Sequence, residues 1–304
     1  MIATAMIARR VVVVGAGPAG LEAARVAGER GHTVTVLEAM PWAGGQIRLA
    51  ARNPRRRDLM GIVEWRVAEL DRRHVDVRYD VIAEVSDVTA LDPDVVIVAT
   101  GAQPQIPELV GAHHVVTSWD VLGGDVTPVG DVLLFDDNGT HSAMSVAEMI
   151  ARSGARLEIV TPERMLGIEV GGMNHVPYAR AFNETDTRIT LNQRVFAIRP
   201  DPKGKKGRLC VEIGSDHSTH RSVRHVDTVV VDGGAAAQDT LYRELKPLSS
   251  NLGAVDVGAL LGGRTQSLVK NPDGRFQLFR IGDAVANRNI HAAVYDALRL
   301  LKDV

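Results

Sequence analysis

The sequence predicts an α/β protein built from two parallel-sheet domains, the second inserted into the first. Short runs of β-branched residues recur along the chain and are typical of parallel strands buried on both faces. Glycines gather where such runs end, which indicates sharp turns between strands and helices. A strand and a helix near the carboxyl terminus repeat the strand–turn–helix pattern seen at the start of the chain, so we assign them to the first domain. The expected domains are 1–126 with 237–304, and 127–236.

The composition fits this fold class and excludes several others. The chain has 304 residues, of which 45% are hydrophobic and 24% charged. At about 150 residues per domain, this length gives two globular domains. The formal net charge of -2 leaves no basic footprint for a nucleic-acid partner.

A single cysteine, Cys210, limits the redox chemistry that this chain can carry. One thiol excludes an internal disulfide, a paired-cysteine redox motif and a four-cysteine iron–sulfur site within the chain. The early apolar run Val11–Val14 is too short to span a membrane. Arg9 and Arg10 follow the first apolar residues, whereas a signal peptide has its charges before them. We therefore expect a soluble, cytoplasmic protein.

The first domain opens with a βαβ unit. Val11–Val14 is the first expected strand, and Pro18–Arg30 reads as a helix ended by Gly31. Val34–Leu37 is the second strand, so the unit is complete within about 30 residues. The later elements of the same domain are a charged helix at 55–73, strands at 75–79 and 94–99, a strand at 276–281 and a helix at 290–301.

The second domain repeats the alternation of strands and helices. Pro104 and Pro107 break the pattern and mark the exit from the first domain. The expected strands are 132–135, 157–160, 188–198, 209–213 and 227–231, and the expected helix is 145–152. Residues 200–207 read as a basic hairpin tip that is exposed to solvent.

The strongest functional signal is the run Gly15-Ala16-Gly17-Pro18-Ala19-Gly20, which lies between a strand and a helix. The first glycine allows the tight turn, the second lets a pyrophosphate approach the backbone, and the third lets helix and sheet pack closely. Glu38 ends the next strand and would bind the adenosine ribose. The bland alternative is a glycine-rich turn without a ligand. With strand, helix and distal acid all present, the run favours dinucleotide binding, within a fold that the order of elements predicts to be two Rossmann-like dinucleotide-binding domains.

Two further segments favour a flavin over a nicotinamide. Gly44-Gly45-Gln46 follows the second strand, and Gly282-Asp283 ends the last one. An aspartate there can bind a ribityl hydroxyl of FAD. The helix that begins near Asn289 would direct its amino terminus at the flavin, where it stabilises the negative charge of the reduced ring.

These motifs, with Ala99-Thr100-Gly101 and Arg288 to Ala293, resemble the carboxyl-terminal half of trimethylamine dehydrogenase, 2,4-dienoyl-CoA reductase and related demethylases. The resemblance runs from Arg10 to Leu301. It implies an FAD site, and it assigns neither a catalytic side chain nor a metal ligand to this chain. The expected cofactor-binding residues are Gly15, Gly17, Pro18, Ala19, Gly20, Glu38, Ala39, Gly44, Gly45, Gln46, Thr100, Gly101, Gly282, Asp283, Asn289, Ile290 and His291.

The resemblance also implies a missing half. In those enzymes an FMN-binding TIM barrel carries a cysteine-ligated 4Fe–4S cluster, and this chain has neither the length for a barrel of about 250 residues nor the cysteines. We therefore hypothesise a separate FMN/iron–sulfur barrel subunit and a hetero-oligomer.

The second domain departs from the pattern of a nicotinamide site. Asp136 and Asp137 stand where a pyrophosphate would bind, and only Gly139 remains for close approach. Because like charges repel, we do not expect NAD(P)H here. Trimethylamine dehydrogenase, which this resembles, does not use its second domain for NADH and holds ADP in its first. ADP therefore remains an alternative to FAD.

Three functions stay open at this point. The first is an FAD-binding oxidoreductase subunit that exchanges electrons with the barrel subunit of an amine or betaine demethylase or an enoate-type reductase. The second is a self-sufficient NAD(P)H-dependent flavin reductase, which Asp136 and Asp137 argue against. The third is a non-catalytic scaffold that binds ADP or FAD.

For the other candidate residues, an ordinary structural role explains the sequence at least as well as a functional one. His291 could lie near the flavin or simply pack at a helix start, and Trp42 could cover a cofactor, dock a partner or fill an interface. Ordinary loop, strand or core roles are expected for His113, His114, His217, His220, His225 and Cys210, and nothing singles out Asn138 or Ser142.

Overall fold

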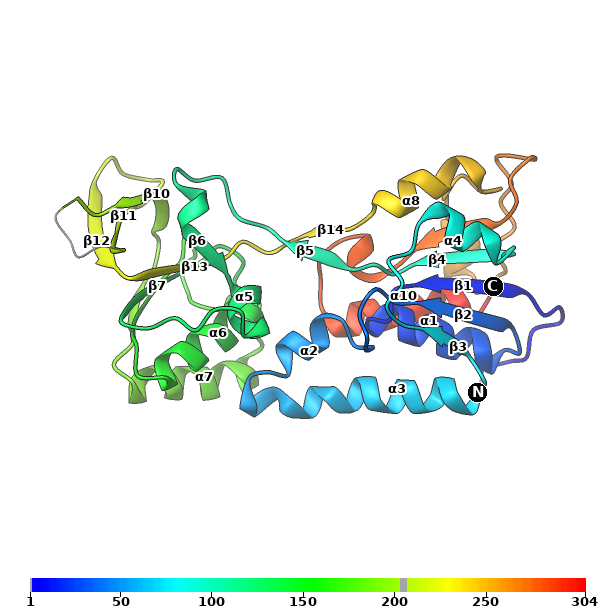
Figure 1. Ribbon diagram of the computed structural model, residues 1–304, viewed down its shortest axis with the longest axis horizontal. Helices are drawn as coiled ribbons and strands as arrows, with labels where there is room; N and C mark the ends of the chain where they lie inside the picture. Colours follow the sequence, from blue (N-terminus) through cyan, green and yellow to red (C-terminus); the bar gives the residue numbers. More distant parts are fainter. Residues whose placement is uncertain (1, 203–206) are drawn as a thin grey trace. The chain divides into compact units, whose positions relative to one another are not determined.

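The computed structural model describes residues 2–202 and 207–304, which form two compact units (Figure 1). Unit 1 comprises Met1–Arg48, Asp58–Gln103 and Ala236–Val304, and unit 2 comprises Leu49–Arg57 and Pro104–Ala235. The expected hairpin tip at 200–207 falls largely on residues outside the described part. No described helix is long and apolar enough to cross a membrane.

The units differ from the expected domain boundaries in two segments. Residues 104–126 lie in unit 2, because strand β6 (Val115–Thr117) pairs in parallel with β13 (Thr228–Asp232) of that unit. Residues 49–57 also lie there, because the Asn53 amide donates to the Glu148 carboxylate at 2.9 Å. Neither pairing is visible in the local pattern.

Unit 1 is built on a five-stranded parallel sheet in the order β15-β4-β1-β2-β3. The strands are β1 (Arg10–Val14), β2 (Thr33–Leu37), β3 (Asp76–Arg78), β4 (Val95–Val98) and β15 (Gln277–Arg280). β1 stands between β2 and β4, so the strand order reverses beside it. In such sheets ligands bind outside the carboxyl ends of the strands at this reversal.

Both faces of this sheet are covered, as the β-branched runs predicted. Val11 and Val13 of β1 pack with helices α1 (Pro18–Glu29), α3 (Met60–Arg72) and α10 (Ile290–Leu301). Val12 and Val14 face α4 (Val85–Ala90) and α8 (Thr240–Leu245). The remaining elements of unit 1 and of the crossing segments are α2 (Gln46–Ala50), η1 (Pro54–Leu59), β5 (Ala102–Pro104), β14 (Ala235–Ala237), η3 (Lys246–Leu248), α9 (Val257–Leu261) and η4 (Gly282–Ala284).

Unit 2 repeats the architecture with a parallel sheet in the order β6-β13-β7-β8-β9. Helices cover one face of this sheet, and a three-stranded antiparallel sheet covers the other. The further strands are β7 (Asp131–Asp136), β8 (Arg156–Val160), β9 (Arg188–Thr190), β10 (Arg194–Pro200), β11 (Leu209–Gly214) and β12 (Arg221–Val226). The helices are η2 (Ala112–His114), α5 (Ser118–Gly123), α6 (His141–Arg152) and α7 (Gly172–Glu184). The α/β class with two Rossmann-like domains is thus confirmed.

Three local expectations for unit 2 need correction. Helix α6 begins at His141, four residues before the expected start, because the Thr140 side chain caps it by accepting from Ser142 N. The expected strand 188–198 is two strands in different sheets. Helix α7 was not foreseen, since it contains Pro177, and tertiary burial of Tyr178 and Phe182 supports it instead.

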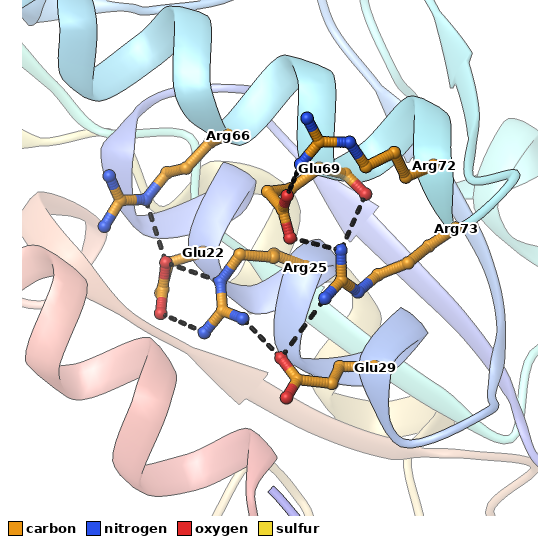
Figure 2. A network of polar contacts seen from close by, with 7 residues as sticks. All are labelled: Glu22, Arg25, Glu29, Arg66, Glu69, Arg72 and Arg73. Carbon is orange, nitrogen blue, oxygen red and sulfur yellow. Dashed lines mark hydrogen bonds and ion pairs between the residues drawn. The ribbon is translucent and has the colours of Figure 1, made fainter. Parts of the chain in front are cut away.

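A network of charged side chains joins α1 to α3 in unit 1 (Figure 2). The Glu22 carboxylate accepts from Arg25 of its own helix at 2.7 Å and from Arg66 of α3 at 2.8 Å. Glu22 and Arg25 are buried. Glu29, Glu69, Arg72 and Arg73 extend the network. It holds α3 against the helix whose amino terminus opens the candidate site.

Candidate dinucleotide site

The site begins at the turn between β1 and α1. Gly15 has φ +99°, and its N–H donates to the Leu37 carbonyl at 2.7 Å. A Cβ added there would lie 2.5 Å from the Ala99 carbonyl oxygen, so no side chain fits. The first glycine of the fingerprint therefore makes the tight turn that the sequence predicted.

The other two glycines of the fingerprint differ in the space that is available for a side chain. A Cβ on Gly20 would lie 1.8 Å from the Gly15 carbonyl oxygen, so α1 packs directly on the turn. A Cβ on Gly17 would meet nothing within 4 Å. Gly17 also caps α1 without any side-chain hydrogen bond, and Pro18 follows in the first turn. An open surface beside uncapped backbone N–H groups is what an anion such as pyrophosphate requires.

Glu38 follows β2 directly and lies beside this turn. Its carboxylate accepts from Ala16 N at 2.6 Å and from Met40 N at 2.8 Å, and the residue is buried. Two backbone donors thus fix the carboxylate next to the fingerprint, while Ala39 beyond it is exposed. Hydrogen bonds from Glu38 to ribose hydroxyls stay a prediction.

The Gly44-Gly45 turn lies against the same loop. Gly44 has φ +125° and donates to the Ala16 carbonyl at 2.8 Å. Gly45 has φ +50°, and its added Cβ would lie 3.2 Å from the Cα of Gly17. Both glycines are therefore needed for the backbone of this turn to lie close to the open side of Gly17.

Gln46 and Asp283 lie together although 237 positions separate them. The Gln46 amide donates to Asp283 Oδ2 at 3.1 Å, and Asp283 Oδ1 accepts from Arg288 N at 3.2 Å. Gly101, after β4, is also adjacent: its added Cβ would lie 3.9 Å from Gln46 Nε2. The structure thus gathers polar groups from three parts of the chain beyond the fingerprint.

The turn after β4 is held by the segment that leads to α8. Thr100 Oγ1 donates to the Gln238 carbonyl at 2.5 Å, and Gln238 N donates to the Gly101 carbonyl at 3.0 Å. The first bond gives the Thr100 hydroxyl a partner within the chain. Its expected contact with a cofactor stays a prediction.

The Gly282 turn connects the group of Gln46, Gly101 and Asp283 to α1 and α10. Gly282 has φ +61°, and its added Cβ would lie 2.8 Å from the Cβ of Ala19. Asn289 caps α10, its side chain accepting from Ala292 N at 2.9 Å, and Ile290 is the first helical residue. His291 is exposed and stacks on Tyr295 with ring centroids 6.1 Å apart, so it has a local role in the helix.

Two residues that support this turn were not among the expected site residues. Asp296 of α10 accepts from Gly282 N at 3.3 Å, and its carboxylate also pairs with the Arg288 guanidinium. Arg288 in turn donates its N–H to Asp283. No spacing rule connects Gly282 with a helical residue 14 positions later, so the sequence offered no signal for Asp296.

The matching turn of unit 2, after β7, has no comparable open side. Asp136 Oδ1 accepts from Asn138 N at 3.2 Å and from Gly139 N at 2.7 Å, so the protein's own carboxylate takes these donors. A Cβ on Gly139 would lie 2.6 Å from the Ile168 side chain, and Glu169 N donates to the Gly139 carbonyl at 3.0 Å. The two loop N–H groups of Asn138 and Gly139 are therefore already paired within the chain.

The titration behaviour of these acids follows from their burial. Burial, with Asp232 and Asp137 nearby, raises the pKa of Asp136 to about 7, although two backbone hydrogen bonds oppose the shift. Burial also raises the pKa of Asp137, against the attraction of Arg194. A carboxyl that holds its proton near neutral pH needs less charge compensation from the protein.

The remaining candidates are placed in ordinary surroundings. His225 pairs with Asp201 at 2.7 Å, the rings of His113 and His114 are in tilted contact, and Cys210 is half-buried in β11. Trp42 is 47% exposed, and the Arg48 guanidinium lies 5.4 Å from its ring centroid. Among the residues the structure describes, no three His, Cys, Asp or Glu side chains are grouped so that they could hold a metal ion.

Comparison with known proteins places the chain in a family. A family model described as pyridine nucleotide-disulphide oxidoreductase matches residues 9–261. A probable N-methylproline demethylase of Rhizobium meliloti is 49% identical over the whole chain. An N,N-dimethylglycine/sarcosine dehydrogenase of Chromohalobacter salexigens is 40% identical over 97% of it. In each case the chain spans 44% of the relative's length.

Solved structures agree with this placement. Histamine dehydrogenase from Rhizobium sp. 4-9 matches 99% of the chain with a TM-score of 0.78 and 25% identity, and the match covers 45% of that protein. Thioredoxin reductase of Lactococcus lactis has the same fold over 97% of both chains, with a TM-score of 0.67 and 19% identity.

Proposed function

Because the chain belongs to the pyridine nucleotide-disulphide oxidoreductase family and is an oxidoreductase of the flavin-dependent kind, we propose that unit 1 binds FAD and carries electrons. Its partner would be a separate FMN and 4Fe–4S barrel subunit. The observation that carries this proposal is the grouping of Gln46, Gly101 and Asp283 beside the glycine fingerprint. ADP alone would end short of these residues, whereas FAD would reach them.

The residues present fit such a cofactor. The open side of Gly17 and the uncapped start of α1 suit a pyrophosphate, and Glu38 is held where a ribose would follow. The bound flavin would supply the redox chemistry. The protein's part is to bind and orient it: Asp283, fixed by Gln46 and Arg288, offers a carboxylate to the ribityl hydroxyls, and the α10 amino terminus favours negative charge nearby.

The reaction of the complete enzyme would be oxidative demethylation of an N-methylated amine or betaine, or enoate reduction. The names of two relatives support the amine class, since both act on N-methylated amino acids by name. The chain spans less than half of these relatives, which supports its being part of a larger enzyme. Purification from the native host should recover a flavin- and iron-containing partner. A chain that purifies alone and is active alone would contradict the barrel-subunit proposal.

Electrons would not enter through NAD(P)H at unit 2. The Asp136 carboxylate already accepts from Asn138 N and Gly139 N, and Ile168 lies against Gly139, which argues against a nicotinamide nucleotide at this turn. Rapid bleaching of the flavin by NADH or NADPH in the isolated chain would overturn this and favour a self-sufficient reductase.

An absorbance spectrum of the purified protein, followed by mass identification of the released nucleotide, tests the cofactor. Flavin bands with released FAD are expected. A colourless protein that releases ADP would support the scaffold alternative, because the fingerprint and Glu38 serve ADP equally well.

Replacing Asp283 distinguishes FAD binding from ADP binding. We expect Asp283→Ala to weaken FAD binding by about 10- to 100-fold, the loss of one hydrogen bond to a charged group, and to leave ADP affinity unchanged. Titration calorimetry of the nucleotide-free protein measures both affinities. Glu38→Gln is the matched control, since it should weaken FAD and ADP alike. Unchanged FAD affinity in Asp283→Ala would show that the ligand does not reach this residue.

A further inference from the structure

Two acidic residues meet in the interior of unit 2, at the carboxyl edge of its parallel sheet. Asp136 ends β7, Asp232 ends β13, and the two are paired in register on neighbouring strands. Asp136 is 0% exposed and Asp232 is 3% exposed. Neighbouring strands lie about 4.8 Å apart, so the two carboxyl groups are close.

Each acid uses one oxygen and leaves the other without a partner. Asp136 Oδ1 accepts from Asn138 N and Gly139 N. Asp232 Oδ1 accepts from the Asn138 side-chain amide at 3.1 Å and from Gly234 N at 3.3 Å. Among the described residues, nothing hydrogen-bonds to Oδ2 of either acid, although both atoms are buried. Buried oxygens on adjacent carboxylates are costly unless a donor lies between them.

A proton is the donor that fits this arrangement. Two buried carboxylates on neighbouring strands repel each other, and one proton between them would remove one charge and give both free oxygens a partner. We propose that Asp136 and Asp232 form a proton-sharing acid pair that keeps a single negative charge among the loop N–H groups where a nucleotide phosphate would bind. The proton thereby couples the stability of unit 2 to pH.

The surrounding charges do not neutralise the pair directly. Arg194 of β10 lies 3.9 Å from the Asp137 carboxylate and pairs with Asp216 as well. Glu163 adds negative charge near Asp137. His141, at the start of α6, has its pKa lowered to about 4 by burial and nearby arginines, so it is neutral. Asp120 on α5 and Glu169 are further acids of the adjoining segments.

The direction of the pH effect follows from the raised pKa of Asp136. Its carboxyl titrates near 3.8 in the unfolded chain and near 7 in the fold. Between these values the folded state holds a proton that the unfolded state has released. The stabilisation is complete below about pH 4 and is lost as the pH rises through about 7, by up to about tenfold in the unfolding equilibrium per pH unit.

Hydrogen exchange of the full chain between pH 5 and pH 8 tests this proposal. Exchange is corrected for its intrinsic rate and read in peptides from β7 and β13, with β1 and β4 of unit 1 as internal reference. Protection of β7 and β13 should fall by about 100-fold over this range relative to the reference. In Asp136→Asn, whose amide can donate to Asp232 without titrating, the fall should disappear. Asp216→Asn, which removes a nearby exposed acid, should retain it.

Infrared spectroscopy gives a second readout that does not depend on variant stability. The wild-type protein at pH 6 should show the carbonyl band of a protonated carboxylic acid. The band should vanish in Asp136→Asn and in Asp232→Asn, since each variant removes the same shared proton. Asp137→Asn should keep both the band and the pH slope. Absence of the band in the wild type, or a slope that persists in both pair variants, would overturn the proposal. Neither readout depends on whether unit 1 binds a flavin.

Discussion

Gly17→Ala is expected to remove nucleotide binding while leaving the nucleotide-free fold intact. The residue has φ -71°, which alanine adopts freely, and the added Cβ would meet nothing within 4 Å. The methyl group would occupy the space in which a pyrophosphate contacts the first turn of α1. Loss of hydrogen bonds between backbone N–H groups and a charged phosphate should weaken binding by about 100-fold or more. Nucleotide content after purification and calorimetry measure the effect.

Two other glycine variants serve as controls for this result. Gly61→Ala lies in α3 with nothing within 4 Å, and it should fold, bind nucleotide and gain up to about 1 kcal/mol. Gly20→Ala should fail to fold, because its Cβ would lie 1.8 Å from the Gly15 carbonyl oxygen. Full nucleotide occupancy in Gly17→Ala would place the ligand away from the fingerprint. If Gly17→Ala does not fold, Asp283→Ala is the test of the site.

Glu22→Gln is expected to cost about 3–5 kcal/mol of unfolding free energy, the range for breaking a buried ion pair by removing one partner. The Glu22 carboxylate bridges Arg25 and Arg66, whose side chains are only 10% and 12% exposed. Glutamine keeps the shape but removes the counter-charge of the buried Arg66 guanidinium and one of the two carboxylates that pair with Arg25, the other being Glu29. Urea unfolding followed by circular dichroism measures the loss.

The matched control is an ion pair at the surface of the same unit. Asp76 and Arg78 lie 2.8 Å apart, but their side chains are 51% and 49% exposed. Asp76→Asn should therefore change the free energy of unfolding by less than about 1 kcal/mol. An equally small loss in Glu22→Gln would mean that Glu29 and Glu69 compensate for Glu22. The remaining carboxylates of the network in Figure 2 would then balance the arginine charges without it.

Much of the candidate site was predictable because its parts obey local rules. Gly15 and Gly20 have no room for a side chain, so their places in the fingerprint follow from the turn itself. Glu38 follows from the length of the βαβ unit. Gly44, Gly45, Gln46 and Asp283 were expected at one site, and the structure brings the last two within hydrogen-bonding distance. Their contacts with FAD stay predictions.

Other features depend on contacts between distant segments and gave no local signal. Asp296 supports Gly282 only because α10 folds back beside the turn. Residues 104–126 belong to unit 2 because β6 pairs with β13, more than 100 positions later. Sequence spacing reports periodicity within one element, and it contains no information on which strand lies beside which.

By itself, the sequence determined the α/β class, the glycine turn that can receive a pyrophosphate, and the mismatch of Asp136 and Asp137 with such a ligand. Only the tertiary structure decided that Asp136 turns its carboxylate onto its own loop and meets Asp232 across two strands. The first set follows from steric limits and charge at single positions. The second depends on burial, which removes water from two acids and makes a shared proton the least costly partner.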